Sequence, residues 1–408
     1  MTDTTTAARP SVPASAAEAL ERLEPILERL RSSASRRERE HELPTGVVRE
    51  LADAGLGALR VPRENGGAGL SFVELGEVLV ELAAADSNLP QIFRGHFAFV
   101  EDRLTAPASA ERDAWLERFA AGEIVGNAWS ETGSVGLGDS GTHIRRTPDG
   151  PRVDGRKFYT TGSLYADWID ATAKDADGTD ATVLLRVDQP GVSVRDDWDG
   201  FGQQLTGTGT AVFDDAAASP ADVFRFSDRF RYQTALYQWV LVSVLAGIAQ
   251  ATEREAGEAL RARTRVYSHG LAPLAKDDGQ LQAVIGEISA VAFTARALVR
   301  SVGEALDAAA VAASRRGSAE DDEANVRAEI ASAQAQIVLS QSVPLAATRL
   351  FDTLGASAVS RAAGLDRHWR NARTVASHNP WVYKARIVGD WSVNGTVPPY
   401  IWQIGTAS

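Results

Sequence analysis

The chain of 408 residues contains no cysteine, which excludes disulfide bonds, thiolate metal sites and cysteine nucleophiles. It also has no excess of positive charge, because 54 acidic residues outweigh 42 lysines and arginines and give a net charge of −12. A nucleic-acid-binding protein needs a basic face, so nucleic acid is not an expected partner. No uncharged apolar run reaches about 18 residues, so no membrane span is expected. The N-terminus lacks the basic and apolar segments of a secretory signal, and the sequence therefore predicts a cytoplasmic protein.

Two further kinds of site are not expected. The six histidines show no His-x-x-x-His spacing, so the sequence gives no indication of a metal site. The glycines of "GSVGLGDSG" (133–141) precede no helical pattern, so they do not match a dinucleotide-binding fingerprint. We therefore expect this chain not to bind NAD(P)H itself.

Hydrophobic periodicity divides the chain into four parts. Residues 1–14 are rich in Thr, Ala, Pro and Ser and are expected to be a disordered tail. Residues 15–121 carry apolar residues at helical spacing and predict an N-terminal helical domain. Residues 122–226 contain short β-type runs between turn dipeptides and predict a β-barrel or sandwich. Residues 227–408 predict a C-terminal four-helix bundle with a tail. The fold class is therefore α+β, in the order helical domain, β domain, helical bundle.

The helices that the pattern predicts are long in the C-terminal part. They cover 233–266, 278–314 and 319–354, and a fourth begins near Gly364 and ends by Pro380. In the N-terminal part, helices are expected at 16–41, 44–54, 72–86 and 90–106.

This order of domains, together with "GNAWSETGSVG" (126–136), "VDGRKFYTTGSLYADWI" (153–169) and "RNAR" (370–373), resembles the acyl-CoA dehydrogenase superfamily. The resemblance implies a homotetrameric flavoprotein whose flavin lies between the β domain and the bundle. Segment 130–139 then corresponds to one flavin-binding motif, with Ser130 supplying a hydroxyl, and "FYTTG" (158–162) corresponds to a second. Backbone amides and short hydroxyls suit the polar edge of an isoalloxazine ring.

The resemblance also implies which residues bind the cofactor. Thr160 would lie near flavin N5, and a loop arginine would reach the flavin phosphate from a neighbouring subunit. The single glycine at the end of the third long helix, where two would be expected, favours FMN over FAD, which remains an alternative. The implied cofactor-binding residues are Asn127, Trp129, Ser130, Tyr159, Thr160, Thr161, Trp198, Arg265, Gly355, Ala356 and Ser357.

The end of the chain bears on the reaction. Counting from "RNAR", the glutamate that removes the substrate α-proton in acyl-CoA dehydrogenases falls on Asn379, which cannot accept a proton. The alternative position of that base, near 245–249, holds no carboxylate either. The segment "RHWRNARTVASHNPWVYKARIVGDWSVNG" (367–395) resembles instead the branch of two-component flavin-dependent monooxygenases that includes dibenzothiophene monooxygenase.

This branch implies a particular chemistry. A separate NAD(P)H-dependent reductase supplies reduced flavin, which reacts with O2 to a C4a-hydroperoxide, and this oxygenates sulfur, nitrogen or carbon of a small substrate. Donors near the flavin must hold and protonate the peroxide. Histidine suits that task, so His378 is the first candidate and His96 the second, with Thr160 as a hydroxyl partner and Asn379 beside His378.

Several alternatives stay open. His378 could cap a helix, His96 could be a core histidine, and Trp129 and Trp198 could be core aromatics. The chain could also be an acyl-CoA dehydrogenase with a relocated base, or a flavin-less binding scaffold. The substrate pocket is expected between 90–106, Trp198 and 230–241, lined by apolar and aromatic residues, which suits an aromatic or heteroatom-bearing substrate.

Overall fold

The computed structural model describes residues 12–131 and 140–400. Most of the predicted disordered tail, and most of the flavin-motif segment 130–139, lie outside these residues. The described part has the predicted order of a helical domain, a β domain and a helical bundle, which confirms the fold class.

The N-terminal domain is built from amphipathic helices whose apolar faces meet in one core. Ser71 and Glu74 form a capping box that begins α3, each satisfying a backbone N–H of the other. The predicted helix 90–106 is interrupted at Phe93, and a helix that was not predicted, α6, follows it. The helices are α1 (Ala16–Arg39), α2 (Thr45–Asp53), α3 (Phe72–Ala85), α4 (Leu89–Ile92), α5 (Arg94–Thr105) and α6 (Ala110–Ala120).

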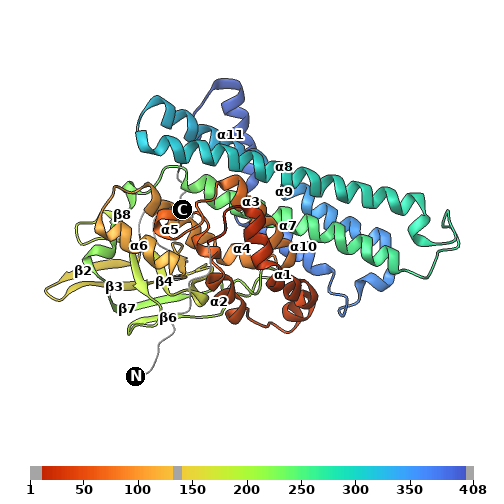
Figure 1. Ribbon diagram of the computed structural model, residues 1–408, viewed down its shortest axis with the longest axis horizontal. Helices are drawn as coiled ribbons and strands as arrows, with labels where there is room; N and C mark the ends of the chain where they lie inside the picture. The colour runs from red at the N-terminus through yellow and green to blue at the C-terminus, as the bar shows by residue number, and fades with distance from the viewer. Residues whose placement is uncertain (1–11, 132–139, 401–408) are drawn as a thin grey trace.

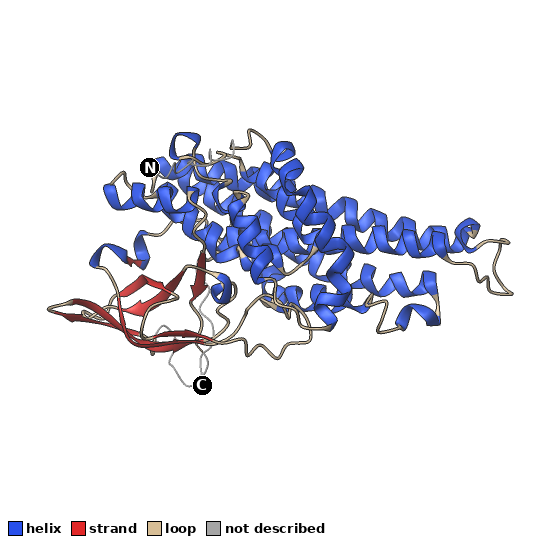
Figure 2. Ribbon diagram, turned by 60° about the horizontal axis from the view of Figure 1, so that its bottom comes forward, coloured by secondary structure: helices blue, strands red, loops and turns tan. Residues whose placement is uncertain are grey.

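The β domain is one mixed sheet with the strand order β6-β7-β3-β2-β4-β5-β8, and β1 pairs with β4 in parallel (Figure 2). Among the described residues the two end strands of this order, β6 and β8, do not pair with each other, so the sheet is open. The predicted β domain is therefore present, as one continuous sheet. The strands are β1 (Val125–Ala128), β2 (His143–Thr147), β3 (Gly150–Lys157), β4 (Trp168–Lys174), β5 (Asp180–Arg186), β6 (Val192–Val194), β7 (Ala211–Ala217) and β8 (Val223–Arg225).

The C-terminal part contains three long helices, and the end of the bundle formed by them extends away from the sheet (Figures 1 and 2). Four helices of this part match the predicted bundle. A fifth, α11, was missed because Pro380 was interpreted as the end of the last helix. Pro380 instead directly precedes the first residue of α11, a place that proline tolerates because the first N–H groups of a helix need no intrahelical acceptor. The helices are α7 (Gln233–Ala262), α8 (Gly279–Ala312), α9 (Ala319–Leu354), α10 (Asp366–Ser377) and α11 (Trp381–Asn394).

Two of these helical segments, 233–262 and 279–315, are long and apolar enough to cross a membrane by length and composition alone. In the first, which is α7, 89% of the apolar window is buried, because α7 is the central helix of the protein core. In the second, which contains α8, only 22% of the window is buried. Phe293 and Val311 on α8 are 69% and 71% exposed, so α8 presents an apolar face that no described part of this chain covers.

Candidate functional site

Trp129 lies where the β domain meets the bundle. It follows β1, in which Asn127 pairs with Asp170 of β4. The indole Nε1 of Trp129 donates to Asp170 Oδ2 at 3.3 Å, and the ring packs against Tyr237 of α7 with centroids 5.3 Å apart. Trp129 therefore forms a wall between the sheet and α7, held in place by a buried carboxylate.

The turn after β3 brings several predicted residues together. The backbone N–H of Phe158 donates to the carbonyl oxygen of Ser130 at 2.8 Å, which joins the two segments predicted to bind flavin. Tyr159 has a φ of 59°, which is unfavourable for a residue with a side chain, and it is 45% exposed. Its ring contacts Trp198, with centroids 6.0 Å apart. The backbone thus holds an aromatic ring out at the end of a strand beside a second aromatic ring.

The hydroxyl groups of Thr160 and Thr161 are engaged within the protein. Thr160 Oγ1 donates to the carbonyl oxygen of Gly209 at 3.1 Å, and Thr161 Oγ1 lies 2.7 Å from Thr208 Oγ1. Both side chains are buried and tie the turn to loop 206–209. The turn depends on Gly162, which has a φ of 82° and whose Cβ, if present, would lie 2.2 Å from the carbonyl oxygen of Ile92.

His378 caps the C-terminal end of α10 and combines two properties. Its side chain is accessible to solvent, yet protein surrounds it closely enough for burial to dominate its ionisation. Burial and the charge of Arg94 lower its pKa to about 3, against hydrogen bonds that include one between the imidazole and the side chain of Asn379. The imidazole is therefore neutral at neutral pH, with one N–H donor and one acceptor nitrogen. His378 is thus an exposed, neutral histidine whose ring direction is set by Asn379.

Arg94 and Tyr237 were not predicted as site residues. Arg94 begins α5 and is buried, with its guanidinium 5.2 Å above the ring of Tyr237. Its neighbour Gly95 packs directly on Asn127, because a Cβ at Gly95 would lie 2.8 Å from Asn127 Oδ1. Neither Arg94 nor His378 forms an ion pair with a carboxylate of the described residues. The sequence signal that could have revealed Arg94 is a lone charge within the apolar run "LPQIFRGHFAFV" (89–100).

His96, the second catalytic candidate, is fully buried and engaged by the backbone on both sides. Its Nε2 donates to the carbonyl oxygen of Gly57 at 2.9 Å, and its Nδ1 accepts from the N–H of Val125 at 3.2 Å. Burial lowers its pKa to about 4. This geometry favours the core alternative, in which His96 joins the N-terminal domain to β1.

We expect His96 to make the protein sensitive to acid. The unfolded chain takes up a proton near pH 6.5 and the folded chain only near pH 4, so stability falls as the pH drops between these values, by about 3 kcal/mol in total. Urea unfolding of the wild type and of His96→Gln at pH 7 and pH 5 measures this. The variant should lose less free energy of unfolding on acidification than the wild type does. His143→Gln, at an exposed position of β2, is the control. Equal losses in His96→Gln and the wild type would refute this role.

The remaining predicted residues lie at the far end of the bundle. Arg265 follows α7, and Gly355, Ala356 and Ser357 follow α9, all exposed. Arg263 links the two segments, because it donates to the carbonyl oxygens of Arg265 and Thr353. In the figures this end lies away from the sheet (Figures 1 and 2), so one chain does not bring these residues to Tyr159 and Trp198.

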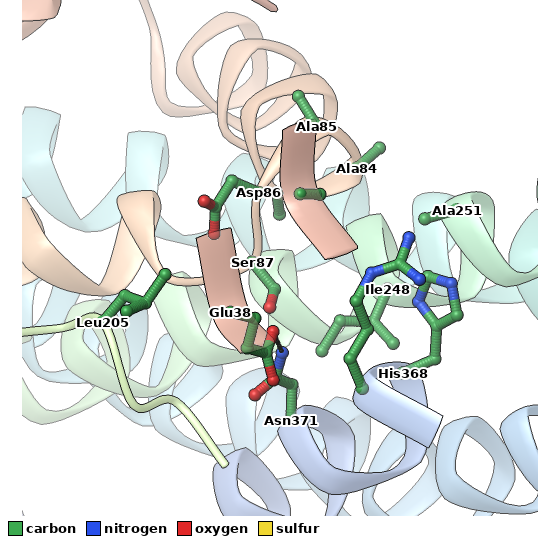
Figure 3. Close-up of a pocket in the computed structure, with 13 residues that line it drawn as sticks. Glu38, Ala84, Ala85, Asp86, Ser87, Leu205, Ile248, Ala251, His368 and Asn371 are labelled. Carbon is green, nitrogen blue, oxygen red and sulfur yellow. Dashed lines mark hydrogen bonds between the residues drawn. The ribbon is translucent and has the colours of Figure 1, made fainter. Parts of the chain in front are cut away.

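Two hollows of the molecule lie elsewhere. One, of about 20 Å³, is a polar seam in which Glu38 and Asn371 lie side by side and Asn371 donates to Glu38 (Figure 3). Its volume suits a single water molecule. The other, of about 490 Å³, is an open hollow beside Arg60, Arg63 and Arg112. No predicted catalytic or cofactor-binding residue lines either hollow, although Glu101, Leu104 and Thr105 of the predicted pocket segment 90–106 line the second one. Among the described residues, no cluster of three His, Asp or Glu side chains is arranged to hold a metal ion.

Comparison with known proteins places these features in a family. Residues 23–123 match the family model of the acyl-CoA dehydrogenase N-terminal domain, and residues 239–381 match that of the C-terminal domain. Together the two matches cover more than half of the chain and include Arg94, most of α7 and His378.

The chain is similar over most of its length to proteins named as monooxygenases. The chain is 25% identical to the probable FMNH2-dependent monooxygenase SfnC of Pseudomonas putida, over 85% of this chain and 88% of the relative. It is 27% identical to dibenzothiophene monooxygenase of Rhodococcus erythropolis, over 91% and 92%. The crystal structure of FMN-bound TdsC from Paenibacillus sp. A11-2 superposes with a TM-score of 0.84 at 28% identity, over 93% of this chain and 98% of that one. By its two domain matches and its fold, the chain belongs to the acyl-CoA dehydrogenase superfamily.

Proposed function

We propose that this chain is the oxygenase of a two-component flavin-dependent monooxygenase. It takes reduced FMN and O2 and inserts one oxygen atom into sulfur, nitrogen or carbon of a small aromatic or heteroatom-bearing substrate. The observation that carries this proposal is His378, a neutral and exposed histidine that lies beside Asn379, and Asn379 stands where dehydrogenation would require a carboxylate. The similarity to SfnC and to dibenzothiophene monooxygenase supports it.

The residues present fit FMN. Tyr159 and Trp198 offer aromatic surface at the strand end, and Asn127 Oδ1 is a buried acceptor without a hydrogen-bond partner, as required for a ligand N–H. The hydroxyl groups of Thr160 and Thr161 already form hydrogen bonds within the protein. Their proposed contribution to FMN binding is therefore to hold the shape of the loop. Bound FMN would supply the activation of O2.

The chain's own residues would do three things. His378 donates a hydrogen bond to oxygen that becomes negatively charged, and Asn379 fixes the direction of its ring. Trp129 and Tyr237 exclude water from the side of α7. His96 positions β1, and thereby Asn127 and Trp129, through its bond to Val125.

The proposal includes an assembly. The exposed apolar residues of α8 and α9, among them Phe293 and Leu345, suit contact with further copies of the chain, as in a homotetramer. A neighbouring copy would then bring Arg265 and Gly355–Ser357 to the flavin phosphate. A separate NAD(P)H-dependent reductase would deliver reduced FMN by diffusion, and the cytoplasm is the proposed location.

A test starts from the purified full chain and reduced FMN. Titration without oxygen measures binding, and we expect saturation at one FMN per chain. Admission of ¹⁸O2 in the presence of an aromatic sulfide such as dibenzothiophene should then give a product that carries one ¹⁸O atom.

The other outcomes identify the alternatives. Bleaching of bound oxidised flavin by an acyl thioester, without incorporation of ¹⁸O, would indicate a dehydrogenase. If the chain binds neither FMN nor FAD in either redox form, the remaining alternative is a flavin-less binding scaffold.

A further inference from the structure

Arg94 is the exception among the buried arginines of the described residues. Five arginines are buried, and four of them pair with a carboxylate within 4 Å. The pairs are Arg37–Asp86, Arg103–Asp102, Arg229–Asp170 and Arg367–Glu255. Arg94 is only 5% exposed and has no described carboxylate partner, and its Nε is completely covered without a hydrogen-bond acceptor.

An isolated buried cation is costly. Removing a charge from water costs several kcal/mol unless an opposite charge replaces the lost solvation, which is why the other four arginines are paired. Water molecules can accept hydrogen bonds from the guanidinium, but they do not balance its charge. Burial lowers the pKa of Arg94 to about 10, so the side chain stays charged at neutral pH despite this cost. Arg94 is therefore a cation that no carboxylate in residues 12–131 and 140–400 neutralises.

The surroundings of Arg94 are equipped to receive a polar group. The hydroxyl oxygen of Tyr237, whose ring lies under the guanidinium, is also buried without a hydrogen-bond partner. Arg94 is also close enough to the exposed His378 for its positive charge to lower the pKa of that imidazole. One cation and one unpaired hydroxyl therefore lie together next to the proposed reaction centre.

We propose that Arg94 binds a negatively charged group of the substrate, a carboxylate, sulfinate or sulfonate, with the Tyr237 hydroxyl as a second donor. This inference rests on the proposed function and narrows its substrate class to anions. It adds one charged side chain to the pocket that was expected to be lined by apolar and aromatic residues. A guanidinium suits such a group because its N–H donors match two oxygens of one anion.

A reduced flavin is also an anion, so it is the competing occupant. The positions of Arg94 and Tyr237 in the fold favour the substrate over the flavin as the bound anion. Arg94 and Tyr237 belong to α5 and α7, whereas the residues proposed for FMN come from the strand ends and from Arg265 of a neighbouring copy. The segments 90–106 and 230–241, expected to line the substrate pocket, are the two that contribute Arg94 and Tyr237.

The test uses a matched pair of sulfides that differ in charge. para-(Methylthio)benzoate and para-(methylthio)benzamide have nearly the same shape, and only the first is an anion. We expect calorimetry on the flavin-free full chain to show the benzoate binding roughly 10- to 100-fold more tightly than the amide. With reduced FMN and O2, the same preference should appear in KM for sulfoxide formation.

Three variants separate the roles of the groups. Arg94→Gln should abolish the preference for the benzoate, Arg94→Lys should keep part of it, and Tyr237→Phe should weaken it without reversing it. Because the cation is unpaired, Arg94→Gln should keep or raise the melting temperature, whereas loss of a structural arginine would lower it. Arg145→Gln, an exposed arginine of β2, is the matched control.

Several results would overturn the inference. They are equal binding of both sulfides to the wild type, an unchanged preference in Arg94→Gln, or a selective loss of reduced-FMN affinity in that variant with the preference intact. The last result would assign Arg94 to the flavin. If the anion preference follows Arg94 but no ¹⁸O is incorporated, the anion site stands and the proposed oxygenase function fails.

Discussion

Replacing His378 with alanine should lower the rate of substrate oxygenation by roughly 10²- to 10⁴-fold, the range for loss of a positioned acid–base group. The neutral imidazole is an exposed hydrogen-bond donor, and Asn379 orients it. Without this donor, oxygen activated at bound FMN should be released as hydrogen peroxide. The measurement is the ratio of hydrogen peroxide to oxygenated product per reduced FMN consumed, and this ratio should rise steeply while affinity for reduced FMN changes little.

The controls distinguish chemistry from structure. His143→Ala removes an exposed histidine of β2 and should leave the ratio unchanged. Asn379→Asp places a negative charge beside the imidazole, which raises the pKa of His378 and should shift the acidic limb of the pH–rate profile upward. If His378→Ala oxygenates at the wild-type rate, or if Asn379→Asp leaves the profile in place, His378 is only a helix cap.

Replacing Arg229 with methionine should destabilise the protein by about 3–5 kcal/mol, the usual cost of removing one partner of a buried ion pair. Arg229 is almost fully buried, with Nη1 3.0 Å from Asp170 Oδ2 and 4.0 Å from Asp102 Oδ2. Burial already raises the pKa of Asp170, and Arg229 opposes that rise. Loss of the guanidinium leaves two carboxylates without their shared cation. Urea unfolding at pH 7 measures the difference.

Arg229→Met should also affect the proposed flavin site. The guanidinium of Arg229 lies 4.6 Å from the centre of the Trp129 ring, and Asp170 accepts from the indole N–H of that residue. Arg229→Met should therefore also weaken FMN binding. The double variant Arg229→Met with Asp170→Asn should recover part of the lost stability, because it removes a stranded charge. Arg145→Met breaks exposed ion pairs and should cost no more than about 1 kcal/mol. A similar cost for Arg145→Met and Arg229→Met would contradict this account.

The fold was largely predictable because its signals are local. Three of the long helices, α7, α8 and α9, repeat alanine, leucine and valine at helical spacing over many turns, and the four strands with clear β-type runs appear as β3, β4, β5 and β7. The elements that were not predicted are either very short or are stabilised by contacts with another part of the chain. The strands β6 and β8 have three residues each, and α11 docks on α9 through a buried pair, Lys384 and Glu329. No local pattern reports such a pairing.

The candidate site shows the same division. The family motifs led to Asn127, Trp129, Ser130, Tyr159 and Trp198, which the structure brings together, and to His378 with Asn379. Arg94 and Tyr237 were missed because their significance lies in the absence of a carboxylate near them. Whether a buried charge is compensated depends on chain segments that meet only in the folded protein. The two backbone partners of His96, Gly57 and Val125, likewise come from segments distant in sequence.

The open face of α8 and the distant end of the bundle have a thermodynamic consequence under the proposed assembly. If Arg265 and Gly355–Ser357 of one copy complete the site of another, each bound cofactor bridges two chains and thereby strengthens their association. Mass action then requires the converse: dilution that separates the copies also releases the nucleotide. Apparent cofactor affinity would therefore depend on enzyme concentration, and saturating FMN would slow the exchange of chains between tetramers.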